Sequence, residues 1–282
     1  MNKILIIGAQ GMLGQELLKI FPQAVGWDRE EIDITDEKQV KQKISDLKPA
    51  VVINAAAYNA VDACGQDAEF ELAKKINGYA LGYLADVCLA LNATLVHYST
   101  NYVFAGDKKD GYQESEPPNP VNKYGQSKLL GEREILRRSN LKYYLIRTSK
   151  LFGAKGKSTM AKENFFAQML RLSTKQIELR VVDDELSNFT YAPDLAQATN
   201  ILWQESHASG IYHLVNANPR TWYEGARALF DILGKKVKLI PVAANEFPRP
   251  AKRPKYGTLL NTKFPKLRDY EEALEEYLKD RN

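Results

Sequence analysis

The chain has 282 residues, of which 44% are hydrophobic and 26% charged, with a formal net charge of +4. This composition and length suit two domains, or one large α/β domain with an appended lobe. The sequence has no basic stripe of the kind that binds nucleic acid, and no apolar run approaches the roughly 20 residues of a membrane span. It shows no targeting segment, and Cys64 and Cys88 are not spaced as metal ligands. We therefore expect a cytoplasmic protein that binds no nucleic acid, membrane or metal.

The first half of the chain alternates strand and helix signals. Short apolar runs predict strands, and amphipathic patterns predict helices; the strands are expected at 4–7, 25–27, 50–54, 94–99 and 143–147, and the helices at 12–21, 40–47, 70–91 and 124–138. Continuous apolar strands separated by helices are typical of a parallel sheet that is covered on both faces. We therefore predict a Rossmann-type, doubly wound α/β domain over residues 1–150.

The second half is less regular. Its patterns predict helices at 164–172, 192–203, 223–233 and 270–279, and strands at 178–182, 211–215 and 237–241. We interpret residues 151–282 as a smaller α/β lobe that binds the substrate and is interleaved with the last elements of the sheet.

A glycine-rich turn joins the first strand to the first helix. Its glycines are Gly8, Gly11 and Gly14. Glycine allows a sharp turn, close approach of the backbone to a pyrophosphate and tight packing of the helix on the sheet. The helix N-terminus adds unpaired N–H groups that favour phosphate. A lone glycine motif is weak evidence, but its position after an N-terminal strand predicts a dinucleotide site.

The residues after the second strand bear on the choice of cofactor. Asp28 lies about 20 residues beyond Gly8, where an acidic side chain hydrogen-bonds the adenosine ribose. Arg29 follows it and could instead face a 2′-phosphate. The sequence therefore leaves NADH and NADPH both open.

A tyrosine, a lysine and the hydroxyls at a strand end form a candidate catalytic group. Tyr124 and Lys128 are four residues apart, and thus on one face of a helix. A carbonyl that receives hydride needs a proton donor, and a nearby lysine cation lowers the pKa of a tyrosine toward the working range. The Ser99–Thr100 hydroxyls end a predicted strand at the edge of the sheet where α/β ligands bind, and can polarise the carbonyl.

With these motifs, the chain resembles the extended short-chain dehydrogenase/reductase family, and within it the dTDP-4-dehydrorhamnose reductase branch. The resemblance runs along essentially the whole chain. It is carried by GAQGMLG at the N-terminus, DITD at 33–36, NAAAY at 54–58, STNYVFAG at 99–106, YGQSK at 124–128, RTS at 147–149, the Trp222–Tyr223 pair and Arg253–Pro254.

The resemblance implies a role for each matching position. Thr100, Tyr124 and Lys128 would form the catalytic triad, with Tyr124 as the proton donor and Lys128 on the nicotinamide ribose. The other cofactor contacts would be Gly8, Gly11, Met12, Leu13, Gly14, Asp28, Arg29, Asp33, Ile34, Ala55, Ala56, Ala57 and Tyr58. The family's reaction moves a hydride from NAD(P)H to the C4 keto group of a dTDP-linked 6-deoxyhexulose. Family members are often homodimers, some with a bridging metal.

The chain departs from the family pattern on the substrate side. Asn101 replaces the usual Asp, Lys150 replaces a sugar-contacting Trp, and Gly65 replaces a Glu, which argues against a bridging metal. These changes predict a different nucleotide-sugar substrate. The expected substrate-side positions are Asn101, Val103, Phe104, Lys150, Trp222 and Arg253. Lys150 and Arg253 could each contact a phosphate; a solvated loop position and a surface ion pair are the respective alternatives.

Two other functions stay open from the sequence. One is a nucleotide-sugar epimerase or dehydratase of the same superfamily, with tightly bound NAD⁺. The other is a non-catalytic binding subunit, because a regulatory subunit of methionine adenosyltransferase resembles the same family. The three histidines are scattered, and His97, which alternates with Val96 and Tyr98 in a strand, is interpreted as a packed core residue.

Overall fold

A six-stranded parallel sheet forms the centre of the molecule. The computed structural model describes residues 3–158 and 161–281. The strand order is β2-β1-β3-β4-β5-β9, and every pairing is parallel. The strands are β1 (Ile4–Ile7), β2 (Val25–Trp27), β3 (Val51–Asn54), β4 (Thr94–Thr100), β5 (Lys142–Thr148) and β9 (Gly210–His213).

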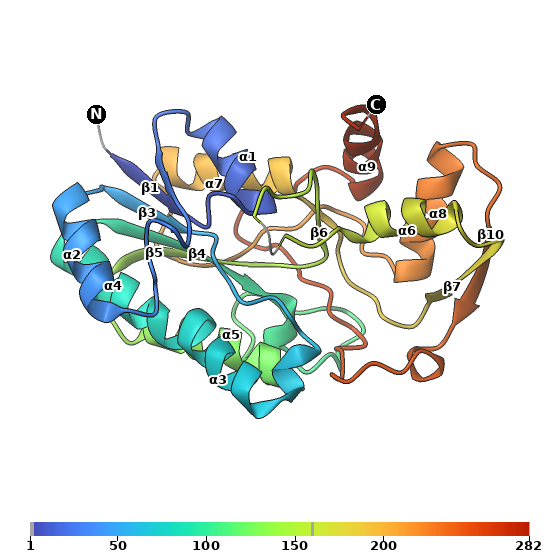
Figure 1. The fold of residues 1–282 in the computed structure, drawn as a ribbon, viewed down its shortest axis with the longest axis horizontal. Coiled ribbons are helices and arrows are strands. Elements are labelled where there is room, and N and C mark those ends of the chain that lie inside the picture. Colours follow the sequence, from blue (N-terminus) through green and yellow to red (C-terminus); the bar gives the residue numbers. More distant parts are fainter. Residues whose placement is uncertain (1–2, 159–160, 282) are drawn as a thin grey trace.

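Helices cover both faces of this sheet (Figure 1). One face carries α1 (Met12–Ile20) and α7 (Ala192–Gln204), and the other carries α2 (Glu37–Leu47), α4 (Ala80–Ala90) and α5 (Lys123–Leu136). Successive residues of a strand point to opposite faces. Ile4 and Ile6 accordingly pack with α1 and α7, whereas Leu5 and Ile7 pack with α2 and α4. Both faces of the strands are buried, which explains their continuous apolar runs.

The helix predicted over 70–91 is interrupted. It consists of α3 (Asp67–Lys74), a π-helical turn (Lys75–Tyr79) and α4. Such π turns are frequent at functional sites. At this turn α5 approaches so closely that a Cβ on Gly131 would lie 2.1 Å from the Asn77 carbonyl oxygen.

A second core lies beyond the end of the sheet. Its elements are β6 (Leu151–Phe152), α6 (Phe165–Ser173), β7 (Glu178–Val182), β8 (Thr190–Tyr191), α8 (Trp222–Ile232), β10 (Lys238–Val242) and α9 (Tyr270–Lys279). β7 pairs with β10 and β6 with β8, both in parallel. Aromatic side chains such as Phe152, Phe189 and Tyr270 fill the space between these elements. Short 3₁₀ turns at Ala63–Gly65, Asn101–Val103 and Ala244–Glu246 complete the described elements.

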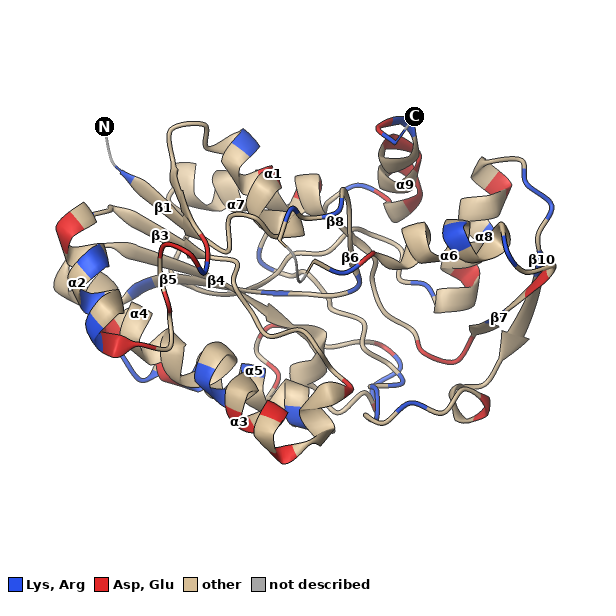
Figure 2. Ribbon diagram, in the orientation of Figure 1, with Lys and Arg blue, Asp and Glu red and all other residues tan. Residues whose placement is uncertain are grey.

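The predicted parallel α/β class is confirmed, and the predicted helices and strands are present with ends shifted by a few residues. The two-residue strands β6 and β8 were not predicted. Within residues 3–158 and 161–281, no helix has the length and apolarity needed to cross a bilayer. Basic and acidic residues are mixed on surface helices such as α2 and α3 (Figure 2).

Candidate active site

The predicted site residues gather at the carboxyl edge of the sheet. Because the strands are parallel, the residues after Ile7, Trp27, Asn54 and Thr100 all emerge at this edge. β2 pairs with one side of β1, and β3 and the later strands lie on the other side, so the order of the strands reverses at β1. In open α/β sheets, ligands bind at such a switch point.

The glycine turn at this switch point depends on missing side chains. Gly8 has φ +79°, and a Cβ there would lie 2.6 Å from the Ala56 nitrogen. A Cβ on Gly14 would lie 2.1 Å from the Gly8 oxygen. Gly11 caps α1 and provides no side-chain hydrogen bond, so the first N–H groups of the helix are available to an anion. The turn therefore fits a dinucleotide pyrophosphate.

A segment from the second half of the chain packs against the same turn. The backbone N–H groups of Lys157 and Ser158 donate to the Gln10 oxygen at 2.8 and 3.2 Å. A Cβ on Gly156 would lie 2.9 Å from the Met12 nitrogen. The segment thus packs against both the Gln10 carbonyl and the start of α1.

Asp28 lies where the sequence predicts the adenosine ribose. Its carboxylate accepts hydrogen bonds from the backbone N–H groups of Gln10, at 3.0 Å, and Arg29, at 2.9 Å. The adjacent cavity has a volume of about 340 Å³ and is lined by Ala9, Gln10, Gln15, Leu18, Gly26, Asp28, Glu31 and Lys157. Asp28, Glu31 and Lys157 are the charged residues that line this cavity. Arg29, the next residue after Asp28, is exposed.

Other predicted cofactor positions differ in exposure. Asp33 is exposed, and its carboxylate accepts from the Thr35 backbone and hydroxyl. Leu13 and Ile34 are buried in the two cores of the sheet, so their side chains pack rather than face the edge. Met12 is partly buried at the start of α1.

The Ala55–Ala57 segment and Tyr58 follow β3 and are all partly buried. Asn77, in the π turn, holds this segment: its Oδ1 accepts from the Tyr58 N–H at 2.8 Å, and its Nδ2 donates to the Tyr58 oxygen at 2.9 Å and the Ser127 hydroxyl at 3.0 Å. The Tyr58 hydroxyl bonds to Glu69, and burial together with that carboxylate raises the pKa of Tyr58 to about 12. The π turn therefore connects the groove segment to α5.

Tyr124 and Thr100 meet at the end of β4. The Tyr124 hydroxyl lies 3.4 Å from the Asn59 Oδ1, and its ring packs edge-on against Tyr102 at 5.7 Å between centroids. Burial raises the pKa of Tyr124 well above its ordinary value, and a hydrogen bond from Thr100 opposes this rise. The phenol is therefore protonated at neutral pH, as a proton donor requires.

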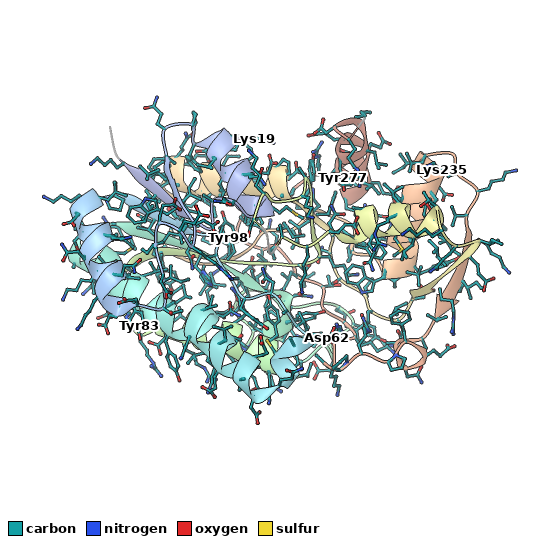
Figure 3. The ribbon with its side chains drawn as sticks, viewed as in Figure 1. Lys19, Asp62, Tyr83, Tyr98, Lys235 and Tyr277 are labelled. Atoms are coloured by element: carbon teal, nitrogen blue, oxygen red, sulfur yellow. The ribbon has the colours of Figure 1, made fainter. Side chains whose placement is uncertain are left out.

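Lys128 lies one turn after Tyr124 but points into the protein. Its Nζ donates to the Tyr98 oxygen at 2.7 Å and lies 3.2 Å from the His97 Nε2. Only 2% of the residue is exposed. Burial lowers the pKa of Lys128 to about 8, although Glu132 acts in the opposite direction. Figure 3 shows Tyr98 in the interior of the molecule.

Two of the predicted substrate contacts lie in the core at the end of β4. Val103 and Phe104 are fully buried, and Phe104 is stacked on Tyr112 with the Arg147 guanidinium 4.9 Å from its ring centroid. Their side chains build the core beneath the edge, and a substrate contact at these two positions stays a prediction. Asn101 is also buried; its Nδ2 donates to the Gly257 oxygen at 3.0 Å.

Lys150 and Trp222 form one cluster. The Lys150 Nζ donates to the backbone oxygens of Arg220, at 2.8 Å, and Glu185, at 3.3 Å, and lies 4.3 Å from the Trp222 ring centroid. Burial lowers the pKa of Lys150 to about 7. The Trp222 indole N–H donates to the Glu185 carboxylate at 3.1 Å. Lys150 is thus neither a solvated loop residue nor a free cation.

Arg253 forms the ion pair that was the alternative interpretation. Its guanidinium donates twice to the Asp62 carboxylate, each time at 2.7 Å. Arg249 similarly pairs with the buried Glu185. Figure 3 shows Asp62 on the lower side of the molecule, in the segment that precedes α3. Burial raises the pKa of Tyr102 to about 12, and the charges of Arg253, Glu185 and Arg249 also act on this pKa. These charged groups therefore lie near Tyr102, whose ring packs on Tyr124.

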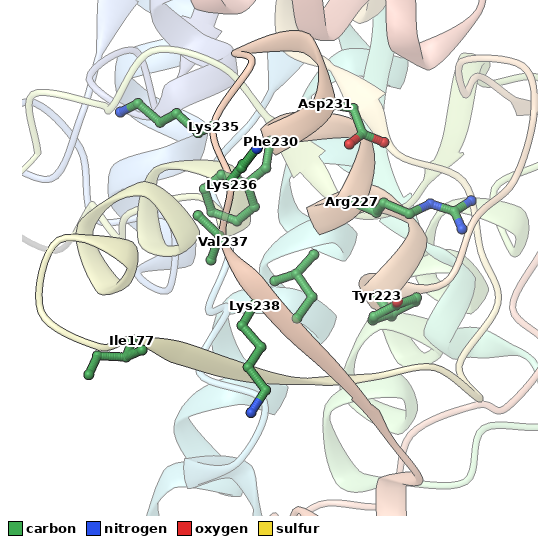
Figure 4. A pocket seen from close by; sticks show the side chains of 10 residues that line it. Ile177, Tyr223, Arg227, Phe230, Asp231, Lys235, Lys236, Val237 and Lys238 are labelled. Atoms are coloured by element: carbon green, nitrogen blue, oxygen red, sulfur yellow. The ribbon is translucent and has the colours of Figure 1, made fainter.

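A separate hollow of about 690 Å³ opens between α8 and the β7–β10 pair (Figure 4). It contains none of the predicted site residues. Its lining consists of Ile177, Tyr223, Arg227, Phe230, Asp231, Lys235, Lys236, Val237, Lys238 and Leu239.

A parallel doubly wound sheet, a glycine turn at its switch point and a Tyr/Lys pair at the same edge define the class of dinucleotide-dependent oxidoreductases. The RmlD substrate binding domain model matches residues 1–282. The chain belongs to this family, which is that of the dTDP-4-dehydrorhamnose reductases.

Three similar proteins illustrate the relation. The spore coat polysaccharide biosynthesis protein SpsK of Bacillus subtilis is 36% identical over 290 residues, which cover 100% of this chain and 99% of that protein. The dTDP-4-dehydrorhamnose reductase of Burkholderia thailandensis is 36% identical over 92% of this chain and 90% of its own length. The crystal structure of the Bacillus anthracis dTDP-4-dehydrorhamnose reductase with NADP has a TM-score of 0.91, 34% identity and 99% coverage of both chains.

Four residues of the site were missed or undervalued by sequence reasoning. Asn59 bonds Tyr124, Asn77 holds Tyr58, Asp62 pairs with Arg253, and His97 contacts Lys128. For His97, the available signal was its place three residues before the end of β4, on the same strand as Thr100. For the others, the partners are too far apart in sequence to be recognised.

Proposed function

We propose that this protein reduces the 4-keto group of a dTDP-linked 6-deoxyhexulose with NAD(P)H. The observation that carries the proposal is the meeting of Tyr124 and Thr100 with the glycine turn at one edge of a parallel sheet. The relatives support the substrate class, because they include dTDP-4-dehydrorhamnose reductases and, at 33% identity, a dTDP-4-keto-6-deoxy-D-glucose reductase of Streptomyces niveus.

We assign the residues as follows. Gly8, Gly11 and Gly14 leave room for the pyrophosphate, whose charge the N-terminus of α1 stabilises. Asp28 faces the adenosine ribose, while Arg29 and Lys157 provide cations beside it. The Ala55–Ala57 segment and Tyr58 line the cofactor groove. The bound dihydronicotinamide supplies the hydride.

The chain's own catalytic work is proton transfer and polarisation. Tyr124 gives its O–H proton to the carbonyl oxygen as that oxygen becomes an alkoxide, and its burial keeps the proton in place beforehand. The Thr100 hydroxyl donates to the same oxygen and stabilises its developing charge. Lys128, one helical turn away, lowers the pKa of Tyr124 when it carries its charge.

We place the substrate between the sheet edge and the lobe of residues 151–282. The proposed determinants of specificity for the sugar nucleotide remain Asn101, Lys150, Trp222 and Arg253. They act through the surfaces that they hold in place. The departures at Asn101 and Lys150 favour a sugar other than dTDP-4-dehydrorhamnose. Cytoplasmic location and a homodimer are further parts of the proposal.

The purified protein should be incubated with NADPH, and in parallel with NADH, and either dTDP-4-dehydrorhamnose or dTDP-4-keto-6-deoxy-D-glucose. We expect stoichiometric loss of absorbance at the dihydronicotinamide band and a 4-hydroxy product by NMR. Conversion without net consumption, with NAD⁺ retained by the protein, would instead establish the epimerase or dehydratase alternative. Absence of turnover with a biological activity that survives Tyr124→Phe would establish a binding subunit.

A further inference from the structure

A lysine that the sequence did not single out lies at the adenosine end of the proposed cofactor site. Lys157 lines the cavity of about 340 Å³ beside Asp28, together with Glu31 and the glycine-turn residue Gln10. It comes from the second half of the chain, shortly after β6, whereas the rest of the lining belongs to residues 9–31. The fold therefore brings Lys157 to this cavity, and no local pattern connects it with the cofactor.

The backbone around Lys157 is fixed against the glycine turn. Its N–H donates to the Gln10 oxygen at 2.8 Å. The preceding Gly156 is buried, and a Cβ there would lie 2.7 Å from the same Gln10 oxygen and 2.9 Å from the Met12 nitrogen. These contacts hold the base of the Lys157 side chain at the cavity, so that only the side chain has to adapt to a ligand.

Two carboxylates line the same cavity, and the backbone engages both. The Asp28 carboxylate accepts from the N–H groups of Gln10, at 3.0 Å, and Arg29, at 2.9 Å. The Glu31 carboxylate accepts from the Asp28 N–H at 2.7 Å. A carboxylate has about four acceptor positions, so Asp28 can still accept from a ribose hydroxyl. By themselves, these two negative charges would favour NADH, because they repel a phosphate on the ribose.

The cations near the cavity are not engaged in this way. Within residues 3–158 and 161–281, neither the Lys157 ammonium nor the Arg29 guanidinium has a hydrogen bond or an ion pair. Each is thus available to an anion without the loss of a contact in that part of the chain. Both residues are exposed, but Lys157 lines the cavity and Arg29 does not. Lys157 therefore has the more direct access to a group bound there.

NADPH differs from NADH by one phosphate, which is on the 2′ oxygen of the adenosine ribose. A phosphate monoester carries a charge of about −1.5 to −2 at neutral pH. We propose that Lys157 is the residue that selects NADPH over NADH, by binding this 2′-phosphate with its ammonium group. Asp28 then accepts from the neighbouring 3′ hydroxyl. The proposal rests on the proposed function, since it takes the dinucleotide to lie on the glycine turn.

Binding of two small nucleotides tests the proposal without the sugar substrate. Adenosine 2′,5′-bisphosphate and adenosine 5′-monophosphate differ only in the 2′-phosphate, and calorimetry measures the affinity of the purified protein for each. We expect the wild type to bind the bisphosphate more tightly. In Lys157→Gln, that affinity should fall about tenfold, an effect between those of an exposed ion pair and a buried charge-assisted hydrogen bond. The affinity for the monophosphate should stay unchanged.

Lys155→Gln is the matched control, because it removes an equal charge two residues earlier. Lys155 is exposed and does not line the cavity. Equal affinities of the wild type for the two nucleotides, or an equal loss in Lys155→Gln and Lys157→Gln, would overturn the proposal. A preference that survives in Lys157→Gln and disappears in Arg29→Gln would overturn it in favour of Arg29.

Removal of a carboxylate from the cavity should have the opposite effect. Glu31→Gln retains an acceptor for the Asp28 N–H and removes the negative charge. We expect this variant to bind the bisphosphate several-fold more tightly, and the monophosphate as the wild type does, because the repulsion of the 2′-phosphate is relieved. An unchanged affinity for the bisphosphate would overturn the assignment of the 2′-phosphate to this cavity.

Cofactor binding separates this inference from the proposed function. Dihydronicotinamide fluorescence should show a lower Kd for NADPH than for NADH in the wild type, and a ratio shifted toward NADH in Lys157→Gln. If this shift occurs and no keto sugar is reduced, the proposed function fails and the role of Lys157 stands. If the keto sugar is reduced and the shift is absent, the role of Lys157 fails and the proposed function stands.

Discussion

The cofactor edge and the substrate side of this protein are built in different ways. At the cofactor edge, Gly8, Asp28, Ala55 and Thr100 each lie at or directly after the end of a parallel strand, so the backbone of the sheet places them. On the substrate side, the charged groups are held by partners distant in sequence, such as Asp62 and Arg253, 191 residues apart. The first region follows from local pattern, whereas the second exists only after both halves of the chain have folded together.

The largest expected effect lies at the cofactor edge. Tyr124→Phe removes the proton donor while leaving the ring packed against Tyr102. Loss of a positioned acid or base costs about 10²–10⁴-fold, and we expect kcat to fall by roughly that factor. NADPH consumption with the keto sugar measures the rate, and cofactor fluorescence should show unchanged NADPH binding. An unchanged rate would exclude Tyr124 as the donor.

Gly14→Ala should disrupt the glycine turn of the cofactor edge. The added Cβ would lie 2.1 Å from the Gly8 oxygen and must displace the turn. We expect the Kd for NADPH to rise at least about tenfold, or about 1.4 kcal/mol. The matched control is Gly65→Ala, where no atom lies within 4 Å of the new Cβ. Equal affinities in the two variants would contradict the close-packed turn.

The substrate side should respond in KM rather than in kcat. Arg253→Ala leaves Asp62 without its partner and loosens the loop beside Tyr102. We expect KM for the sugar nucleotide to rise about tenfold with kcat little changed, the pattern of lost uniform binding. Arg180→Ala, which breaks an exposed pair with Glu246, serves as the control. A fall in kcat with unchanged KM would show that Arg253 acts in the chemical step and not in substrate binding.

A further effect, on stability rather than activity, concerns the core that joins the two regions. Burial, and then the nearby Arg147, lower the pKa of His213 to about 4, against about 6.5 in an unfolded chain. Between these values the unfolded state binds more protons, so the free energy of unfolding should decrease as pH falls from 6.5 to 4, by about 3 kcal/mol at most.

Urea unfolding at pH 7, 6 and 5 measures this loss. His213→Asn keeps a donor toward the Leu260 oxygen but does not titrate in this range. Its stability should therefore depend less steeply on pH. Equal slopes in the variant and the wild type would show that His213 is not responsible.

The contrast between the two regions also explains what the sequence could predict. Apolar runs and the glycine spacing identified the parallel sheet and its ligand-binding edge, because strand ends in a parallel sheet converge. The helix over 70–91 was predicted as one piece, since the π turn at Lys75–Tyr79 depends on the tight approach of α5 rather than on local propensity.

On the substrate side, the sequence did not show which side chains are buried or which partners hold them. Val103 and Phe104 were predicted as ligand contacts within the STNYVFAG segment, and the structure buries both side chains in the core at the 3₁₀ turn of Asn101–Val103. The surroundings of Lys150 come from the segments near Glu185 and Arg220, which no local pattern connects to it. The alternation of Val96, His97 and Tyr98 predicted a packed histidine, and the 1% exposure of His97 confirms it, but the partners Asn54 and Lys128 could not be predicted from the sequence.

The most direct test is a crystal structure of Tyr124→Phe with NADPH and the 4-keto sugar nucleotide bound. We predict the dinucleotide across the Gly8–Gly14 turn, and the keto oxygen within hydrogen-bond distance of Thr100 Oγ1 and facing the ring edge at position 124. A dinucleotide bound elsewhere, or a ring that faces away from the keto oxygen, would contradict the assignment of this edge as the reducing site.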